Sequence, residues 1–239
     1  MAIKENLETF AVKTALKYLN KDPENNIPKL LDMFEILDVK NEFAPIFDSI
    51  RLAVNDKNSN WYKLILSLWQ DIDPGVRNRL FENFVIKGSI AGYKKQEENK
   101  ARYNCNIPWA ILMDPTSACN LNCTGCWAAE YGNDMNLSYE EMDDIVNQGV
   151  ELGTYIYLFT GGEPLVRRRD IIKLCENHPD CVFSAFTNGT LIDEDFADEI
   201  LRVKNFVPAI SIEGFEKETD SRRGLGTYNK IFNAMDILK

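Results

Sequence analysis

The stretch WAILMDPTSACNLNCTGC, residues 109–126, joins a strand-like apolar run to three closely spaced cysteines. Trp109–Asp114 has the length and composition of a buried strand. Cys119, Cys123 and Cys126 follow it with the spacing C-x3-C-x2-C. Three thiolates on one tight loop can hold three irons of a cubane cluster, which leaves the fourth iron open to another ligand.

Two other interpretations of these cysteines stay open on spacing alone. A structural zinc site usually has four protein ligands, and Cys105, upstream of the strand, is the candidate for the fourth. The spacing is also compatible with coincidence.

Downstream of the cysteines, strand-like and helical patterns alternate. Ser138 and Glu141 form a capping box that begins one helix, and Asp193 caps another. Alternation of this kind predicts an α/β fold with parallel strands and right-handed crossovers, whose chemistry lies at the carboxyl ends of the strands. The predicted strands are Trp109–Asp114, Tyr155–Thr160, Cys181–Thr187 and Phe206–Ile212.

The second predicted strand ends in Gly161-Gly162-Glu163-Pro164. Two glycines allow a ligand to approach the backbone closely, and Glu163 can offer a carboxylate to an ammonium group. Taken alone, this stretch is also compatible with an ordinary strand-to-helix turn. Cys126 and Gly161 are 35 residues apart, close to one βα step of roughly 30 residues. We therefore expect the two loops to be neighbours at the same rim.

The order and spacing of these two motifs resemble the radical S-adenosylmethionine (SAM) superfamily, over residues 107–239. The resemblance implies that Cys119, Cys123 and Cys126 bind a [4Fe-4S] cluster. It implies that SAM chelates the open iron and that Gly161-Gly162-Glu163-Pro164 binds its methionine end. In the family, an electron from the cluster cleaves SAM and yields a 5′-deoxyadenosyl radical, which abstracts a hydrogen atom from the substrate.

Later residues resemble the peptide-modifying and cofactor-building branch, which includes the anaerobic sulfatase maturases. By that resemblance Asn188 offers polar groups to SAM, Ser211 or Glu213 meets the ribose hydroxyls, and Arg223 pairs with the SAM carboxylate. Each of these residues is also compatible with a plain turn or a polar surface loop. Arg167, Arg168 and Arg169 suggest a solvated helix start or a docking patch for an acidic electron donor.

The sequence departs from the family pattern at two points. The family usually has an aromatic residue just before the third cysteine, where this chain has Gly125, with Trp127 just after it. The family core usually has six βα units, and we count four. The resemblance therefore implies a partial (β/α) TIM-type barrel, and we expect the chain to be the N-terminal part of a longer polypeptide.

The residues before the first strand carry a different pattern. Residues 1–93 show helical periodicity and almost no strand signal, so we predict an all-helical domain of four or five helices. Residues 94–106 are mostly polar and predict a linker or a solvated helix end. Residues 107–239 form the predicted radical SAM core. The helical domain is either a packing domain or a partner-docking module.

Charge and hydropathy narrow the class of protein. The net charge is −10, which disfavours non-specific nucleic-acid binding or attachment to an anionic membrane. No apolar run approaches the roughly 18 residues of a membrane span, and the N-terminus lacks a signal-peptide core. We therefore expect a cytoplasmic protein, where thiols stay reduced.

The sequence thus predicts a radical SAM enzyme with a [4Fe-4S] cluster and SAM as cofactors. Its expected partners are a reduced flavodoxin or ferredoxin as electron donor and a peptide, protein or cofactor precursor as substrate. The alternatives are a non-catalytic zinc-binding or protein-interaction module, and a degenerate radical SAM fold that keeps a cluster without turnover.

Overall fold

The computed structural model describes residues 2–37 and 44–239 of the chain. Residue 1 and residues 38–43 of the predicted helical domain lie outside the described residues. The chain divides into two compact units, Met1–Asn78 and Arg79–Lys239.

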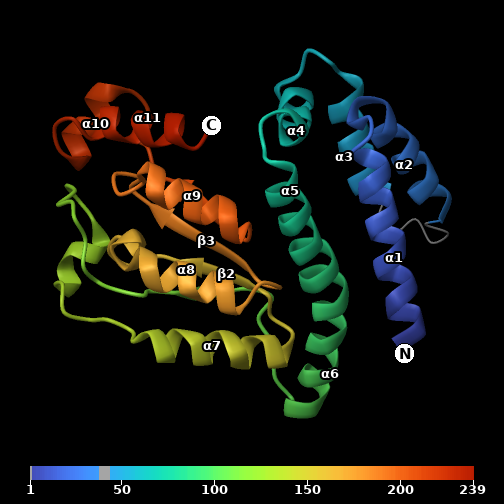
Figure 1. Ribbon diagram of the computed structural model, residues 1–239, viewed down its shortest axis with the longest axis horizontal. Helices are drawn as coiled ribbons and strands as arrows, with labels where there is room; N and C mark the ends of the chain where they lie inside the picture. The colour runs from blue at the N-terminus through green and yellow to red at the C-terminus, as the bar shows by residue number, and fades with distance from the viewer. Residues whose placement is uncertain (1, 38–43) are drawn as a thin grey trace. The chain divides into compact units, whose positions relative to one another are not determined.

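The first unit is helical in all its described elements, in agreement with its apolar periodicity. Asn20, just after the first helix, accepts a hydrogen bond from Trp69 Nε1 at 2.9 Å and donates one to Asn78 at 2.9 Å. Ser59 caps the fourth helix by accepting from the Tyr62 N–H. The helices (Figure 1) are α1 Ala2–Leu19, α2 Pro23–Leu37, α3 Ala44–Asn55, α4 Asn60–Gln70 and α5 Pro74–Phe81, the last of which crosses the unit boundary.

The second unit opens with further helix rather than with a strand. A π-helix, η1 Glu82–Gly92, leads into α6 Tyr93–Tyr103, where the sequence suggests a linker or a helix end. Lys95 Nζ donates to Val150 O at 2.7 Å, and Gln96 donates to Gly153 O at 2.8 Å. The polar face of α6 therefore satisfies carbonyls at the end of α7 Tyr139–Leu152, which a helix leaves unpaired.

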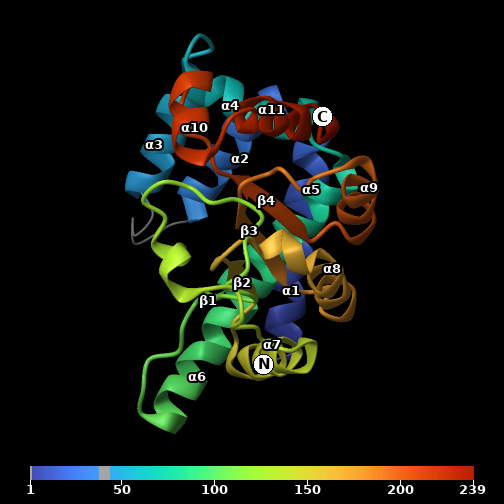
Figure 2. The same cartoon turned by 90° about the vertical axis from the view of Figure 1, so that its left-hand side faces the viewer.

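A four-stranded, all-parallel sheet forms the centre of this unit. The strands lie in the order β1-β2-β3-β4 (Figure 2). All four predicted strands are present, each shortened at one or both ends: β1 Ile111–Met113, β2 Ile156–Phe159, β3 Val182–Thr187 and β4 Phe206–Ile210.

Helices α7, α8 Arg168–Asn177 and α9 Glu194–Val203 alternate with the strands and cover one face of the sheet (Figure 1). Ser138 and Glu141 form the predicted capping box of α7, and Asp193 caps α9 through the Phe196 N–H. The core between these layers is continuous, and its largest fully buried members include Tyr157, Phe159, Phe183, Met142, Ile171 and Leu174.

The opposite face of the sheet stays accessible within the described residues. Leu112 on β1 is 59% exposed, Phe186 on β3 is 51% exposed and Val207 on β4 is 39% exposed. Parallel sheets bury both faces in complete α/β folds, so this apolar face is typical of the interior of a partial barrel. The α/β prediction, with about four βα units, is confirmed.

Two helices follow β4, α10 Glu216–Arg223 and α11 Thr227–Ile237. Helix α10 is not among the helices that the sequence predicts. Two short 3-10 helices, η2 Trp127–Tyr131 and η3 Pro164–Arg167, follow the two motifs. In the part of the chain that the structure describes, no helix is long and apolar enough to cross a membrane.

Candidate functional site

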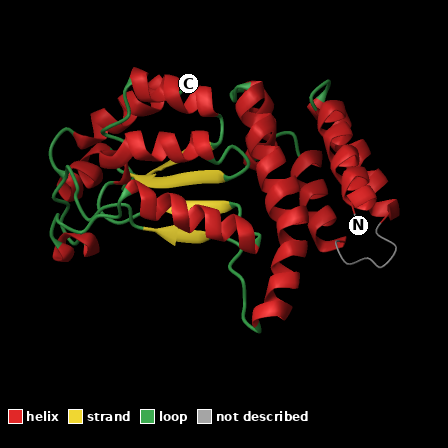
Figure 3. Ribbon diagram, turned by 60° about the horizontal axis from the view of Figure 1, so that its bottom comes forward, coloured by secondary structure: helices red, strands yellow, loops and turns green. Residues whose placement is uncertain are grey.

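The loops that follow the strands gather at one end of the sheet (Figure 3). The loop after β1 carries the three clustered cysteines, and the loop after β2 carries the Gly161–Pro164 turn. Thr160 N–H donates to Met113 O at 3.0 Å, so the β1–β2 pairing continues to this rim. Parallel topology thus brings the two motifs together, as their spacing predicts.

Cys119, Cys123 and Cys126 line one cavity of about 480 Å³, and Gly162 of the second motif lines it as well. We call it the cysteine cavity. Cys119 Sγ accepts a hydrogen bond from the Leu121 N–H at 3.4 Å, which orients this sulfur. Three thiols around one cavity form the donor set that a [4Fe-4S] cluster with one open iron requires.

The backbone of the second motif fixes the start of the cysteine loop. Gly162 N–H donates to Thr116 O at 2.9 Å, and Glu163 N–H donates to Ala118 O at 2.8 Å. A Cβ on Gly162 would lie 2.2 Å from Ala118 O, and Gly161 has φ +99°. Glycine is therefore required at both positions, because the two loops cross at backbone contact distance.

A second connection joins the cysteine loop to the end of β3. Asn188 Nδ2 donates to Asn120 Oδ1 at 2.9 Å, and Asn120 Nδ2 donates to Thr190 Oγ1 at 2.8 Å. Asn188 Oδ1 accepts from both the N–H and the hydroxyl of Thr190. The polar groups of the Asn188 side chain are thus engaged in holding the loop.

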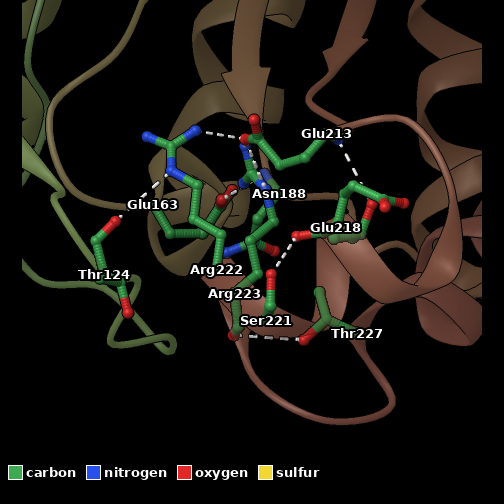
Figure 4. Close-up of polar contacts among 10 residues, drawn as sticks. Thr124, Glu163, Asn188, Glu213, Glu218, Ser221, Arg222, Arg223 and Thr227 are labelled. Atoms are coloured by element: carbon green, nitrogen blue, oxygen red, sulfur yellow. Dashed lines mark hydrogen bonds and ion pairs between the residues drawn. The ribbon is translucent and has the colours of Figure 1, made fainter.

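A third connection joins the loop to α10, as Figure 4 shows. Thr124 N–H donates to Arg222 O at 2.8 Å. Arg223 donates through Nε and Nη2 to Glu213 Oε1, at 3.2 and 2.7 Å, and Arg222 pairs with the same oxygen. Hydrogen bonding from Arg223 is the main cause that lowers the pKa of Glu213, so this carboxylate is ionised between two guanidinium groups.

Glu163 is 1% exposed and its carboxylate points into the protein. Its Oε1 accepts from Thr187 Oγ1 at 2.6 Å and from the Leu165 N–H at 3.0 Å, and its Oε2 accepts from the Asn188 N–H at 2.7 Å. Burial raises the pKa of Glu163, while these three donors act in the opposite direction. The side chain therefore joins the ends of β2 and β3.

The cysteines sit in an environment of mixed polarity. Burial raises the pKa of the Cys119 thiol. Burial also raises the pKa of the Cys123 thiol, while the nearby positive charges of Arg223 and Arg222 lower it in part. The two arginines thus offset only part of the increase, and the pKa of the Cys123 thiol stays raised.

The zinc interpretation lacks its fourth cysteine. Pro108 O accepts a 2.5 Å hydrogen bond from Thr154, which precedes β2, so the segment after Cys105 lies at the amino end of the sheet. Cys105 is not among the residues that line the cysteine cavity. Among the described residues, no three His, Cys, Asp or Glu side chains converge as ligands of a single metal ion, and this includes the three cysteines of the cavity.

The remaining predicted site residues lie at the same rim. Ser211 follows β4, and its N–H donates to Thr187 O at 2.9 Å, so it stands beside the end of β3. Pro164 is buried as the first residue of η3. Arg167 donates to the carbonyls of Pro115 and Leu137, at 3.1 and 2.7 Å, so it clamps the loop rather than forming a solvated helix start.

Sequence reasoning missed two residues that hold the cysteine loop, Asn120 and Arg222. Asn120 lies inside the cysteine motif but carries no signal of its own. Arg222 is adjacent to Arg223, which was a predicted site residue. The two neighbouring positive charges were the only sequence signal for Arg222.

Comparison with known proteins agrees with this geometry. The family model of the radical SAM superfamily matches residues 113–239. The chain belongs to the radical SAM superfamily. The matched residues contain all four strands except the first two residues of β1, together with every predicted site residue.

Two relatives whose names describe different reactions resemble this chain. The Fe-coproporphyrin III synthase of Methanosarcina barkeri is 32% identical over 140 residues, which are 55% of this chain and 34% of that protein. The GTP 3′,8-cyclase of Paenarthrobacter nicotinovorans is 44% identical over 87 residues, 33% of this chain and 24% of that protein. The chain thus spans about a third of the first of these relatives and less of the second.

Among solved structures, Streptococcus suis SuiB bound to S-adenosylmethionine superimposes with a TM-score of 0.50 at 17% identity. The match covers 73% of this chain and 43% of SuiB. At this identity the likeness supports the shared fold.

Proposed function

We propose that this chain is the cluster-bearing part of a radical SAM enzyme, with a [4Fe-4S] cluster held by Cys119, Cys123 and Cys126. The observation that carries the proposal is the cysteine cavity. Its walls bring three thiols together with Gly162 of the second motif. When bound, the cluster supplies the electron that cleaves SAM into methionine and a 5′-deoxyadenosyl radical.

In this proposal the protein contributes positioning rather than acid–base catalysis. The Gly161–Gly162 backbone receives the methionine end of SAM. Glu163 acts as a positioning residue, because its two oxygens accept three hydrogen bonds within the protein. It fixes the turn and the end of β3 in one geometry.

The residues after β3 and β4 have related roles. Asn188 orients the cysteine loop through Asn120. Arg223 uses Nε and Nη2 on Glu213, which leaves its Nη1 edge for the SAM carboxylate, since a guanidinium has five N–H donors. Because Glu213 already pairs with two arginines, we assign binding of the ribose hydroxyls of SAM to Ser211.

We propose a peptide, a protein or a cofactor precursor as the substrate class. The two named relatives, an Fe-coproporphyrin III synthase and a GTP 3′,8-cyclase, support the cofactor-precursor alternative, and the peptide or protein alternative rests on the sequence resemblance. A reduced flavodoxin or ferredoxin would supply the electron. Clusters of free thiols persist in a reducing compartment, so we propose the cytoplasm as the location.

Anaerobic reconstitution with iron and sulfide tests the proposal. We expect a brown protein with about four irons and four sulfides per chain, a reduced-state electron paramagnetic resonance signal that changes when SAM is added, and release of 5′-deoxyadenosine with dithionite. A colourless protein with one zinc would refute it. A cluster that binds SAM without yielding 5′-deoxyadenosine would identify a degenerate family member.

A further inference from the structure

A second cavity of about 340 Å³ adjoins the cysteine cavity, at the carboxyl end of β1. Ser117 and Ala128 line both cavities, so the two share a wall. Its volume lies near the lower end of the range for small-ligand sites, roughly 300–1,000 Å³. We call it the Asp114 cavity, and its lining residues are Asp114, Ser117, Trp127, Ala128, Tyr131, Met135, Asn136, Leu137 and Gly161.

Asp114 is the one residue of this lining that carries a charge at neutral pH. Its side chain is exposed and packs against Gly161, where a Cβ would lie 3.0 Å from Asp114 Cβ. Its carboxylate has no hydrogen-bond or ion-pair partner within residues 2–37 and 44–239. The cavity therefore presents an uncompensated negative charge.

Aromatic and sulfur-containing side chains form much of the rest of the lining. Trp127 is 58% exposed and Tyr131 is 57% exposed, and their rings meet edge to face with centroids 5.9 Å apart. Met135 is 54% exposed. Aromatic faces attract cations through the ring quadrupole, and an apolar wall also accommodates the methylene stem of a long cationic side chain.

We propose that the Asp114 cavity is a substrate subsite for an aliphatic cation of the kind that ends a lysine or arginine side chain. Asp114 would bind the charged end, and Trp127 and Tyr131 would pack on the stem. This inference rests on the proposed function, because the shared wall would place the bound group beside the cluster and SAM. It favours a peptide substrate with a basic residue over an anionic precursor.

The test is a titration of the full chain with Nα-acetyl-lysine amide, followed by the indole N–H signals in nuclear magnetic resonance. The Trp127 signal is identified by its loss in Trp127→Phe. We expect this signal to shift with the lysine amide and not with Nα-acetyl-norleucine amide, which has the same stem without the charge. Asp114→Asn and Tyr131→Leu should each weaken binding at least tenfold.

Asp134→Asn is the matched control, since Asp134 is an exposed aspartate nearby that does not line the cavity. It should bind the lysine amide as the wild type does. Equal binding of the norleucine amide, or unchanged binding by Asp114→Asn, would overturn the inference. SAM cleavage by the wild type is measured separately. If it occurs without a lysine response, this inference alone fails, whereas a lysine response in a zinc-containing colourless protein refutes only the proposed function.

Discussion

The two units of the chain bury their apolar residues to different degrees. In the second unit Tyr157, Phe159 and Phe183 are completely buried between the sheet and its helices. In the first unit α4 has no buried residue, while Leu52 is 77% exposed and Trp61 is 67% exposed. The described part of the helical unit thus depends on fewer tightly packed contacts.

This difference in packing also bears on which unit can hold a precisely arranged site. In the second unit the cysteine loop is hydrogen-bonded to the ends of β2 and β3 and to α10, so its geometry is set by a well-packed sheet. Such support is what a precisely arranged ligand set needs. The exposed apolar residues of the helical unit suit a surface role instead, consistent with the packing or docking function that its sequence suggests.

The largest expected effect is on the cluster that we propose for the second unit. Cys123→Ala should abolish the oxygen-sensitive chromophore, because it removes one of the three proposed iron ligands. Iron content and the visible spectrum after reconstitution measure this. Cys105→Ala is the control and should load normally. A full four-iron cluster in Cys123→Ala would contradict the ligand assignment.

The next effect tests the sheet core. Phe159→Ala should lower the free energy of unfolding by about 3–5 kcal/mol, since it empties a buried aromatic site. It stacks on Phe183 with ring centroids 5.9 Å apart. Urea unfolding followed by circular dichroism provides the measurement. A loss below about 1 kcal/mol would mean that this core is far more tolerant than its burial indicates.

A smaller effect is expected at the rim. Glu163→Gln keeps the side-chain size but places an amide N–H₂ among three donors, so one buried donor loses its acceptor. The expected cost is about 1–3 kcal/mol in the free energy of unfolding, with weaker SAM binding measured by equilibrium dialysis of the reconstituted protein. Glu151→Gln, at an exposed position on α7, should leave both quantities unchanged.

The smallest effect is expected in the helical unit. Trp61→Ala should change the free energy of unfolding by less than about 0.5 kcal/mol, because the ring is mostly in solvent. The same urea titration applies. A loss of several kcal/mol would show that this ring packs against a surface in solution, and the contrast between the units would then disappear.

Local signals predicted most of the second unit. The strands follow from short β-rich apolar runs, and α7 and α9 follow from caps at Ser138 and Asp193 that act within one helical turn. Helix α10 was missed because Glu216–Arg223 contains no apolar residue, so periodicity has nothing to detect. The cysteine motif and the Gly161–Pro164 turn were predicted as neighbours because parallel topology fixes which ends meet.

What the sequence left open depends on contacts between distant residues. The hydrogen bond between Asn188 and Asn120 spans 68 positions, and no sequence pattern in either segment predicts it. The buried role of Glu163 was also missed, because its carboxylate looks the same in sequence whether it faces a ligand or the end of the next strand. Asn83 of the π-helix η1 likewise donates to the carbonyls of Pro179 and Cys181, which lie 96 and 98 positions away.

The bond between Thr124 and Arg222 has a consequence for the order of assembly. The two residues lie 98 positions apart, so a ribosome would release the cysteines well before the segment that steadies their loop. Iron arriving in that interval would meet thiols on an incompletely tethered loop. We therefore expect metal that is delivered after translation of α10 to find the cysteines of the proposed cluster site on a tethered loop.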